Sequence, residues 1–327
     1  MIRAAIIGAG LMGRWHADAA IRSGGRVVAV VDPRTERVRA LAARGTVQAP
    51  SIAEVDLAAV DVAHVCTPTA SHADLARSVL LAGCHAIVEK PLAAGAAETD
   101  DLLELAGERG RLLCPVHQYV FQRGVARVAG ALDRLGVVRH VDVTICSSGA
   151  DDLSDEQRDR IAAEILSHPL SLLARLFDWR LDEIPWSVAR PASGEIRAIA
   201  PAGEGTIELL VSMGARPTRS TLVILGEAGS VHVDLFHGFA VFEGGGASRG
   251  RKIARPFTLA GGTLLRAGAN LARRAGRREP AFPGLRELVS RCYAAVRDPA
   301  LPGPIPPAET RAVARAREAI LGRPPDR

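Results

Sequence analysis

The stretch Ile6-Ile7-Gly8-Ala9-Gly10-Leu11-Met12-Gly13 decides the fold of the first third of the chain. It joins an apolar run at residues 2–7 to a helical pattern at residues 12–23. The first glycine permits a tight turn, the second lets the backbone approach a pyrophosphate, and the third allows close packing of helix on strand. The positive end of the helix then faces the phosphates. In this setting the glycine pattern predicts a dinucleotide-binding βαβ unit.

Outward from this stretch, short β-rich runs alternate with helical patterns, which is typical of a parallel sheet with crossover helices. After about residue 120 the strands are longer and joined by short turns, which indicates an antiparallel sheet. We therefore predict an α/β protein with an N-terminal Rossmann domain, a doubly wound parallel sheet, in residues 1–118. Residues 119–327 are predicted to form a C-terminal α+β domain with a mostly antiparallel sheet, which binds substrate and supports oligomerisation.

The choice between NAD and NADP rests on the end of the next predicted strand. Asp32 lies there, about 20 residues beyond the glycines, where a carboxylate can accept hydrogen bonds from the adenosine ribose hydroxyls. NAD is favoured because a carboxylate repels the 2′-phosphate of NADP. Arg34 and Arg37 keep NADP open as the alternative, since either could reach that phosphate.

Composition excludes several other classes of protein. Hydrophobic residues make up 48% and charged residues 24% of the 327 residues, which is the balance of a globular protein. The five cysteines are widely spaced without a CxxC pair, which argues against a disulfide framework and a cysteine zinc site. We predict no metal site. No apolar stretch approaches the ~20 residues of a membrane span, and the N-terminal run is interpreted as a strand, so a cytoplasmic location is expected.

The positive charge is concentrated late in the chain. Of the net charge of +5, much lies in the segment from Arg249 to Arg278, where Leu264–Ala275 is predicted to be a basic surface helix. Such a segment could bind nucleic acid or a membrane surface. It lacks interleaved aromatic residues, so a solvated loop and helix that covers a cleft or a subunit contact is favoured. We therefore expect a small-molecule substrate and neither a nucleic-acid nor a membrane partner.

A second group of motifs narrows the family. Three stretches follow predicted strands or helices: Cys66-Thr67-Pro68-Thr69-Ala70-Ser71-His72, Ala82-Gly83-Cys84-His85 and Glu89-Lys90-Pro91. Together with the glycine motif, they resemble the glucose–fructose oxidoreductase and inositol dehydrogenase family (Gfo/Idh/MocA). The match runs from Ile2 to about His117, and Glu-Lys-Pro is its most specific part. The second domain is similar mainly in its order of elements.

The resemblance implies roles at the matching positions. Thr67 and Pro68 would line the nicotinamide side of a cleft, Glu89 would hold a ribose hydroxyl, and Lys90 would point between nicotinamide and substrate. An ammonium in a partly dry cleft can also stabilise negative charge that develops on a heteroatom, which supports Lys90 independently. His72 either joins this site or simply caps its helix. The predicted cofactor-binding residues are Gly8, Gly10, Leu11, Met12, Gly13, Asp32, Arg34, Thr67, Pro68, His72, Glu89, Lys90 and His117.

The substrate side is represented by Glu164 and His168. The family usually carries an Asp and a His at this spacing, so the resemblance implies His168 as a proton shuttle that Glu164 orients, with Lys90 completing the predicted catalytic set. Pro169 follows directly, so we expect His168 to cap a helix beginning at Pro169, with Glu164 in the preceding turn. A structural histidine is the alternative. Val120 replaces a common arginine and Glu164 the usual Asp, which puts a standard sugar or polyol substrate in doubt.

Three functions stay open at this point. The first is an NAD(P)-dependent dehydrogenase or reductase acting on a C–O or C–N carbon of a small metabolite, such as a sugar, polyol or biosynthetic intermediate. The second is a lyase or glycosidase that recycles bound NAD, and the third is a non-catalytic dinucleotide sensor. Lys90 and His168 favour chemistry over sensing. The resemblance further suggests a homo-oligomer, a dimer or tetramer packed through second-domain sheets.

Overall fold

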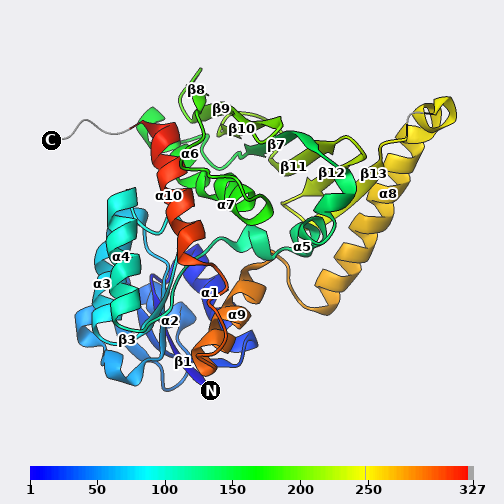
Figure 1. Ribbon diagram of the computed structural model, residues 1–327. Helices are drawn as coiled ribbons and strands as arrows, with labels where there is room; N and C mark the ends of the chain where they lie inside the picture. The colour runs from blue at the N-terminus through cyan, green and yellow to red at the C-terminus, as the bar shows by residue number, and fades with distance from the viewer. Residues whose placement is uncertain (247, 323–327) are drawn as a thin grey trace. The chain divides into compact units, whose positions relative to one another are not determined.

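The computed structural model describes residues 1–246 and 248–322 of the chain (Figure 1). Helices and strands are both abundant, and the strands form one six-stranded and one seven-stranded sheet. Among the described residues, every helix is too short or too polar to cross a membrane.

The chain forms two compact units. The first contains Met1–Gln118 together with Leu285–Ala314, and the second contains Tyr119–Gly284 and the residues from Arg315 onward. The chain passes from the first unit to the second after Gln118, by which point all six strands of the parallel sheet have been formed. Residues Leu285–Ala314 belong to the first unit by their contacts, whereas the sequence pattern places them with the second domain.

The first unit is built on a parallel sheet with the strand order β3-β2-β1-β4-β5-β6. Strands β1 and β4 are neighbours, and the strand order reverses between them. The glycine turn that follows β1 therefore lies at the position where dinucleotide-binding folds hold their ligand. The predicted doubly wound Rossmann sheet is therefore confirmed. Its strands are β1 (Ile2–Ile7), β2 (Gly25–Val31), β3 (Val47–Ala49), β4 (Val62–Val65), β5 (His85–Val88) and β6 (Leu113–Pro115).

Helices cover both faces of this sheet. Successive side chains of a strand point to opposite faces, so Ile7 packs into one core cluster and Ile6 into another. Both side chains are buried, which explains why the first strand is apolar on both faces apart from the exposed Arg3 near its start. The covering helices of the N-terminal segment are α1 (Leu11–Arg22), α2 (Thr35–Leu41), α3 (His72–Leu81) and α4 (Ala96–Glu108).

The late segment of the first unit returns to helix α1. Helix α9 (Leu285–Arg297) packs against it and carries Tyr293, a fully buried side chain. A Cβ at Gly25 would lie 2.7 Å from the Tyr293 ring, so only glycine leaves room for this tyrosine. The last helix, α10 (Pro307–Leu321), follows a proline-rich connector.

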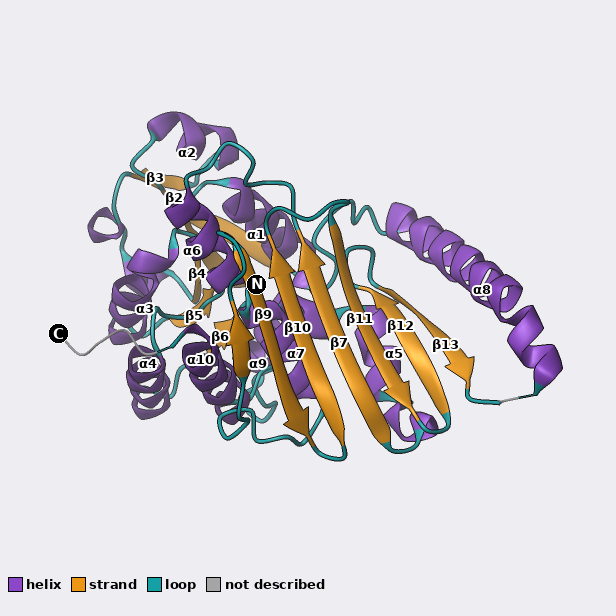
Figure 2. Cartoon of the chain, turned by 90° about the horizontal axis from the view of Figure 1, so that it is seen from above, coloured by secondary structure: helices purple, strands orange, loops and turns teal. Residues whose placement is uncertain are grey.

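The second unit is built on a mostly antiparallel sheet with the order β13-β12-β11-β7-β10-β9-β8, seen face-on in Figure 2. Only the central pair of β7 and β10 is parallel within the described strands. The predicted α+β architecture is confirmed. The strands are β7 (Val138–Cys146), β8 (Ser187–Ala189), β9 (Glu195–Ala202), β10 (Gly205–Ser212), β11 (Arg219–Gly226), β12 (Gly229–Asp234) and β13 (Phe239–Gly244).

Buried and exposed side chains alternate along β9, so the sheet has one covered face and one open face. Helices α5 (Arg123–Ala129), α6 (Asp155–Ile165) and α7 (Ser167–Leu176) belong to this unit. Helix α8 (Arg249–Gly276) lies beside the edge strand β13 (Figure 2). It is more than twice as long as the basic helix predicted from Leu264 to Ala275, because the glycines within it do not interrupt it.

Candidate cofactor site

The glycine turn lies between β1 and α1 and presents bare backbone. Gly8 has a φ of +96°, and a Cβ there would lie 2.6 Å from the carbonyl oxygen of Cys66 at the end of β4. A Cβ at Gly13 would overlap the carbonyl oxygen of Gly8. Around Gly10, which precedes α1, the nearest atom to a built Cβ is an Arg37 guanidinium nitrogen at 3.8 Å. The first and third glycines are therefore structural necessities, while the second leaves open space beside the helix N-terminus.

Asp32 lies at the end of β2, next to this turn, and is almost fully buried. Its carboxylate accepts hydrogen bonds from the backbone N–H of Ala9 (3.0 Å), the backbone N–H of Arg34 (2.9 Å) and the Arg34 Nε (3.2 Å). Burial opposes ionisation, but these hydrogen bonds outweigh it and lower the pKa of Asp32. The carboxylate is thus fixed and charged, and a carboxylate has lone pairs for further donors.

Glu89 and Lys90 follow β5 at the same carboxyl edge of the sheet. The Glu89 side chain is buried, with Oε1 3.1 Å from His16 Nε2 and Oε2 accepting the Lys90 backbone N–H at 3.2 Å. Burial opposes its ionisation, yet the hydrogen bond from His16 and the nearby positive charges lower the pKa of Glu89. The Lys90 side chain is only partly buried. The site therefore holds a fixed carboxylate beside a partly solvated ammonium.

A buried hydrogen-bonded chain runs from Glu89 into the core of the first unit. His16 Nδ1 lies 2.9 Å from His64 Nδ1, and His64 Nε2 lies 2.8 Å from the Tyr293 hydroxyl. All three of these side chains are fully buried. Desolvation, together with the charge of His16, places the pKa of His64 well below its ordinary value, so His64 is neutral. The chain fixes the orientation of His16 and, through it, of Glu89.

Two loops at the carboxyl edge are tied together by His72. Its Nδ1 lies 2.8 Å from the carbonyl oxygen of Pro91, and its Nε2 lies 2.8 Å from the carbonyl oxygen of Thr67. Ser71 reinforces the first loop, because its hydroxyl lies 2.8 Å from Thr67 Oγ1 and 2.9 Å from the carbonyl oxygen of Pro68. Both ring nitrogens of His72 therefore face main-chain carbonyls, and the residue positions the loops that carry Thr67 and Lys90.

The remaining predicted cofactor residues of the first unit lie around the same edge. Leu11 begins α1 and is 66% exposed, an apolar side chain beside the phosphate-facing turn. Met12 is half-buried. His117 follows β6 and is buried, with its backbone N–H donating to the Pro115 carbonyl at 2.9 Å.

In the second unit, Glu164 and His168 lie on different helices. Glu164 is near the end of α6 and His168 is the second residue of α7, with Leu166 between the helices. The expectation that the helix begins at Pro169 was wrong by two residues, because Pro169 is accommodated within the first turn, where its missing N–H costs no hydrogen bond. The largely buried His168 ring stacks on Tyr119, with ring centroids 4.3 Å apart.

These features fit a dinucleotide. The glycine turn offers main-chain donors at a helix N-terminus for phosphates, and its first and third glycines leave no room for side chains. Asp32 and Glu89 offer two separate anchored carboxylates that can accept hydrogen bonds from hydroxyl groups. Within the first unit, the structure brings together the predicted turn, Asp32, Thr67 and Lys90 at one edge of one sheet.

Sequence reasoning missed His16, His64 and Tyr293, which support Glu89 in the first unit, and Tyr119, which stacks on His168 in the second unit. His16 follows Gly13 by three residues on α1, so its position near the turn was readable from helical spacing. His64 and Tyr293 are 229 residues apart, and no local pattern signals their contact. The stacking of Tyr119 on His168 likewise depends on tertiary packing.

Comparison with known proteins gives a match for the N-terminal part of the chain. Residues 2–117 match a family model described as an oxidoreductase family with an NAD-binding Rossmann fold, Gfo/Idh/MocA. The match ends where the first segment of the first unit ends. It covers the turn, Asp32 and the Glu-Lys-Pro stretch.

Relatives and solved structures extend the similarity. UDP-N-acetylglucosamine 3-dehydrogenase of Acidithiobacillus ferrooxidans is 34% identical over 133 residues, which cover 38% of this chain and 42% of that enzyme. Inositol 2-dehydrogenase of Rhizobium meliloti is 29% identical over 209 residues, 62% of each chain. The chain thus aligns with less than two thirds of either relative. The structure of levoglucosan dehydrogenase in complex with NADH and levoglucosan has a TM-score of 0.76 at 16% identity, covering 98% of this chain and 96% of that one, and so shares the fold.

Proposed function

Because residues 2–117 belong to the NAD-binding Rossmann domain of the Gfo/Idh/MocA oxidoreductase family, we propose that the whole chain is an NAD-dependent dehydrogenase or reductase. The reaction is hydride transfer between the nicotinamide ring and a carbon that bears oxygen or nitrogen in a small metabolite. The observation that carries this proposal is the common edge that holds the glycine turn, Asp32, Glu89 and Lys90. The bound coenzyme supplies the hydride acceptor or donor, and the chain's own residues do the rest.

The first unit binds and orients the coenzyme. The turn from Gly8 to Gly13 takes the pyrophosphate, and Leu11 covers it with an apolar side chain. Asp32 accepts hydrogen bonds from the adenosine ribose and disfavours a 2′-phosphate, which supports NAD over NADP. Glu89, held by His16, takes a hydroxyl of the second ribose.

Lys90 handles the charge that hydride transfer creates. When a hydride leaves or reaches a carbon, the heteroatom on that carbon must lose or gain a proton. The Lys90 ammonium donates a hydrogen bond to that heteroatom and stabilises its negative charge. Both carboxylate oxygens of its neighbour Glu89 already have partners other than this ammonium, namely His16 Nε2 and the Lys90 backbone N–H.

The second unit contributes His168 as a second proton-handling group. A histidine can donate or accept a proton near neutral pH, and stacking on Tyr119 fixes the plane of this ring. Glu164, on the preceding helix, is the proposed orienting carboxylate. We propose His168 as the group that exchanges the substrate proton with solvent.

A sugar or polyol derivative is the proposed substrate class. The relatives named above act, by their names, on a nucleotide sugar and on inositol. Val120 and Glu164 depart from the family pattern, so the substrate of this chain carries a different arrangement of polar groups. An oligomer through the open face of the seven-stranded sheet remains part of this proposal.

The test begins with purified protein and its bound coenzyme. After release of that coenzyme, sugars and polyols are offered with NAD+ or NADP+ while absorbance of the reduced nicotinamide is followed. Net reduction in proportion to product supports a dehydrogenase. Turnover without net change in coenzyme would show the non-redox lyase or glycosidase instead, and binding without turnover would show a sensor.

The Lys90→Ala variant tests this proposal most directly. We expect kcat to fall by roughly 100- to 1,000-fold, the size seen when a charge-stabilising donor is removed, with NADH affinity nearly unchanged. Arg109→Ala, an exposed basic residue at the end of α4, is the control and should keep full activity. An unchanged kcat in Lys90→Ala would remove this lysine from the mechanism.

A further inference from the structure

Two helices of the second unit contribute arginines to one small pocket, which we call the arginine pocket. It has a volume of about 330 Å³ and lies between α5, α8 and the start of β13. Its charged lining residues are Arg123 and Arg127 of α5 and Arg266 and Arg273 of α8. Within the described residues, no carboxylate lines it. Four positive charges therefore surround a space whose own lining does not neutralise them.

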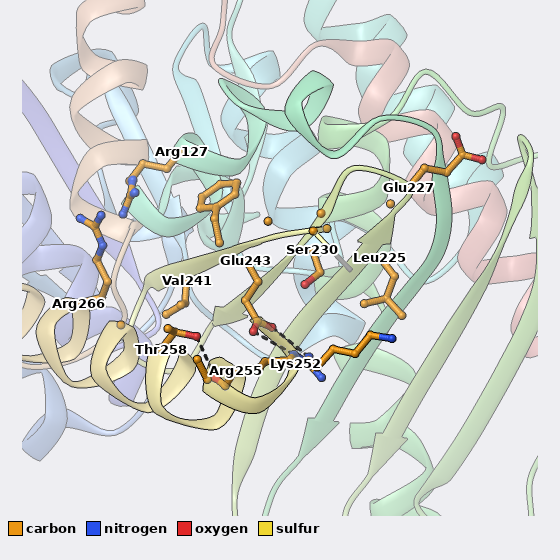
Figure 3. Close-up of a pocket in the computed structure, with 18 residues that line it drawn as sticks. Arg127, Leu225, Glu227, Ser230, Val241, Glu243, Lys252, Arg255, Thr258 and Arg266 are labelled. Carbon is orange, nitrogen blue, oxygen red and sulfur yellow. Dashed lines mark hydrogen bonds and ion pairs between the residues drawn. The ribbon is translucent and has the colours of Figure 1, made fainter. Parts of the chain in front are cut away.

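The spacing of these arginines places like charges together. Arg123 and Arg127 are four residues apart on α5, so they are neighbours on one face and their charges repel each other. Arg266 and Arg273 are seven residues apart on α8, which is close to two helical turns, so they also share a face. Figure 3 shows the guanidinium groups of Arg127 and Arg266 pointing toward one another from the two helices. Helical spacing and tertiary packing thus bring charges of one sign to one place.

The pKa values of two of these arginines agree with this arrangement. Partial burial lowers the pKa of Arg127, and the charges of Arg266 and Arg123 lower it further. Partial burial and the charge of Arg123 likewise lower the pKa of Arg273. The charge of Glu279 opposes this effect at Arg273, but Glu279 does not line the pocket. A bound anion would relieve the repulsion among the guanidinium groups.

Both helices are fastened to the turn between β12 and β13, so the arginine pocket has anchored walls. On the α5 side, Gln122 Nε2 donates to the Leu235 carbonyl at 2.7 Å. On the α8 side, Asn270 Nδ2 donates to the His237 carbonyl at 2.9 Å. The largely buried Asn270 also accepts a hydrogen bond from Arg273 Nη2 at 2.7 Å, through its Oδ1. One of the four guanidinium groups is therefore held in place by a fixed amide.

The chemistry of guanidinium groups indicates which anion the pocket suits. Each guanidinium presents a planar fork of N–H donors that matches phosphate oxygens, and here the forks come from two walls. A phosphate monoester carries a charge of about −1.5 to −2 at pH 7 and three acceptor oxygens in different directions, so both walls can hold it. A carboxylate has a single charge and two oxygens in one plane. The lining therefore favours a phosphate group over a carboxylate.

A larger cavity adjoins the arginine pocket (Figure 3). It has a volume of about 850 Å³, and Arg127 and Arg266 line both spaces. Apolar side chains such as Leu225 and Val241 contribute to its lining. Sites for small molecules have volumes of ~300–1,000 Å³, so the two spaces together have room for an organic molecule with one charged end.

We propose that the arginine pocket binds the phosphate group of a small phosphorylated metabolite, whose uncharged part occupies the adjoining cavity. Arginines of α5 and α8 donate hydrogen bonds to the phosphate oxygens from two walls. The basic segment that contains α8 thereby acquires a ligand, whereas its sequence alone favoured a solvated helix that covers a cleft. The site belongs to the second unit alone, and the proposal does not depend on the proposed coenzyme binding or enzymatic activity.

Calorimetry of the full chain at constant ionic strength tests the site, with inorganic phosphate, glycerol 3-phosphate and succinate as probes. Glycerol 3-phosphate should bind saturably with a Kd below about 1 mM, and succinate, also a dianion, should bind ~10-fold or more weakly. The variant Arg127→Gln/Arg266→Gln should bind both phosphates roughly 10- to 100-fold more weakly, because charge-assisted hydrogen bonds are lost.

The matched control is Arg134→Gln/Arg197→Gln. It removes the same charge from exposed positions of the second unit outside the arginine pocket, and it should bind like the wild type. Glycerol 3-phosphate should also raise the melting temperature of the wild type and of this control, but not that of Arg127→Gln/Arg266→Gln. Melting without any probe establishes that both variants are folded.

Several outcomes overturn the proposal. Equal weakening in the two double variants would show an adventitious ion only, held by the overall charge. Succinate bound as tightly as glycerol 3-phosphate would reject phosphate as the ligand class. Weakening by Gly13→Ala and not by Arg127→Gln/Arg266→Gln would place the phosphate at the glycine turn. Capture of single-stranded DNA by a wild type that binds neither phosphate probe would assign the arginines to nucleic acid.

Discussion

The two units organise their candidate residues in different ways. In the first, a parallel sheet delivers the glycine turn, Asp32 and Lys90 to one edge, because the carboxyl ends of parallel strands meet there. In the second, Glu164 and His168 lie on two consecutive helices, and the Tyr119 ring stacks on His168. The candidate cofactor residues of the first unit are therefore fixed by backbone topology, while the candidate residues of the second unit depend on individual side-chain contacts. Changes to the first unit should have larger and more predictable effects.

The largest effect is expected at Gly13. A methyl group there overlaps the Gly8 carbonyl, so Gly13→Ala must displace the turn and its phosphate donors. Loss of two hydrogen bonds to a charged group should weaken NADH binding by roughly 100-fold. Gly107→Ala is the matched control, since a Cβ at this helical glycine meets nothing within 4 Å. Fluorescence titration of NADH measures both, and equal affinities would contradict the assigned turn.

Asp32 should give the next largest effect, on coenzyme choice. Asp32→Ala removes hydrogen bonds to the ribose and the repulsion of a 2′-phosphate, so NAD+ should bind about 10- to 100-fold more weakly, while NADP+ loses less. Asp18→Ala, which removes only an exposed ion pair with Arg22 on the same helix, should change neither affinity. Competition of the two coenzymes for one site is the measurement. A preserved preference for NAD+ would show that selectivity lies elsewhere.

Breaking the buried hydrogen-bonded chain behind Glu89 should lower the stability of the fold more than it lowers the affinity for the coenzyme. Tyr293→Phe leaves the Nε2 of fully buried His64 without its hydroxyl partner, which should cost about 1–3 kcal/mol in the free energy of unfolding. Urea denaturation measures the loss. A variant as stable as the wild type would mean that the hydroxyl adds nothing to the packing of α9.

The same chain predicts a pH dependence of stability. The pKa of His64 is well below its ordinary value in the folded state, so between that pKa and about 6.5 the unfolded chain binds more protons. The stabilising contribution of neutral His64 should therefore be complete above about pH 7. On acidification the free energy of unfolding should fall by up to ~1.4 kcal/mol per pH unit. His64→Gln should have a flatter profile between about pH 7.5 and pH 5. Parallel profiles would exclude His64 as the source.

The two units also differ in how much of their structure can be predicted from the sequence. The turn from Gly8 to Gly13 and the acid at Asp32 are local patterns whose function follows from backbone geometry, and the parallel sheet confirms their setting. The bond between His64 and Tyr293 is not readable locally, since it joins a strand to a helix from the far end of the chain. The sequence pattern predicts only the later half of helix α8, whereas the helix runs from Arg249 to Gly276 through its internal glycines.

The docking of a dinucleotide at the glycine turn is the central claim, and calorimetry tests it most directly. Coenzyme-free protein titrated with NAD+ and with NADP+ should show saturable binding at one site per chain, tighter for NAD+, and Gly13→Ala should lose the signal. Absence of heat with either coenzyme at about millimolar concentration, where even weak association of a few kcal/mol is visible, would contradict the account, provided that the purified protein also carries none.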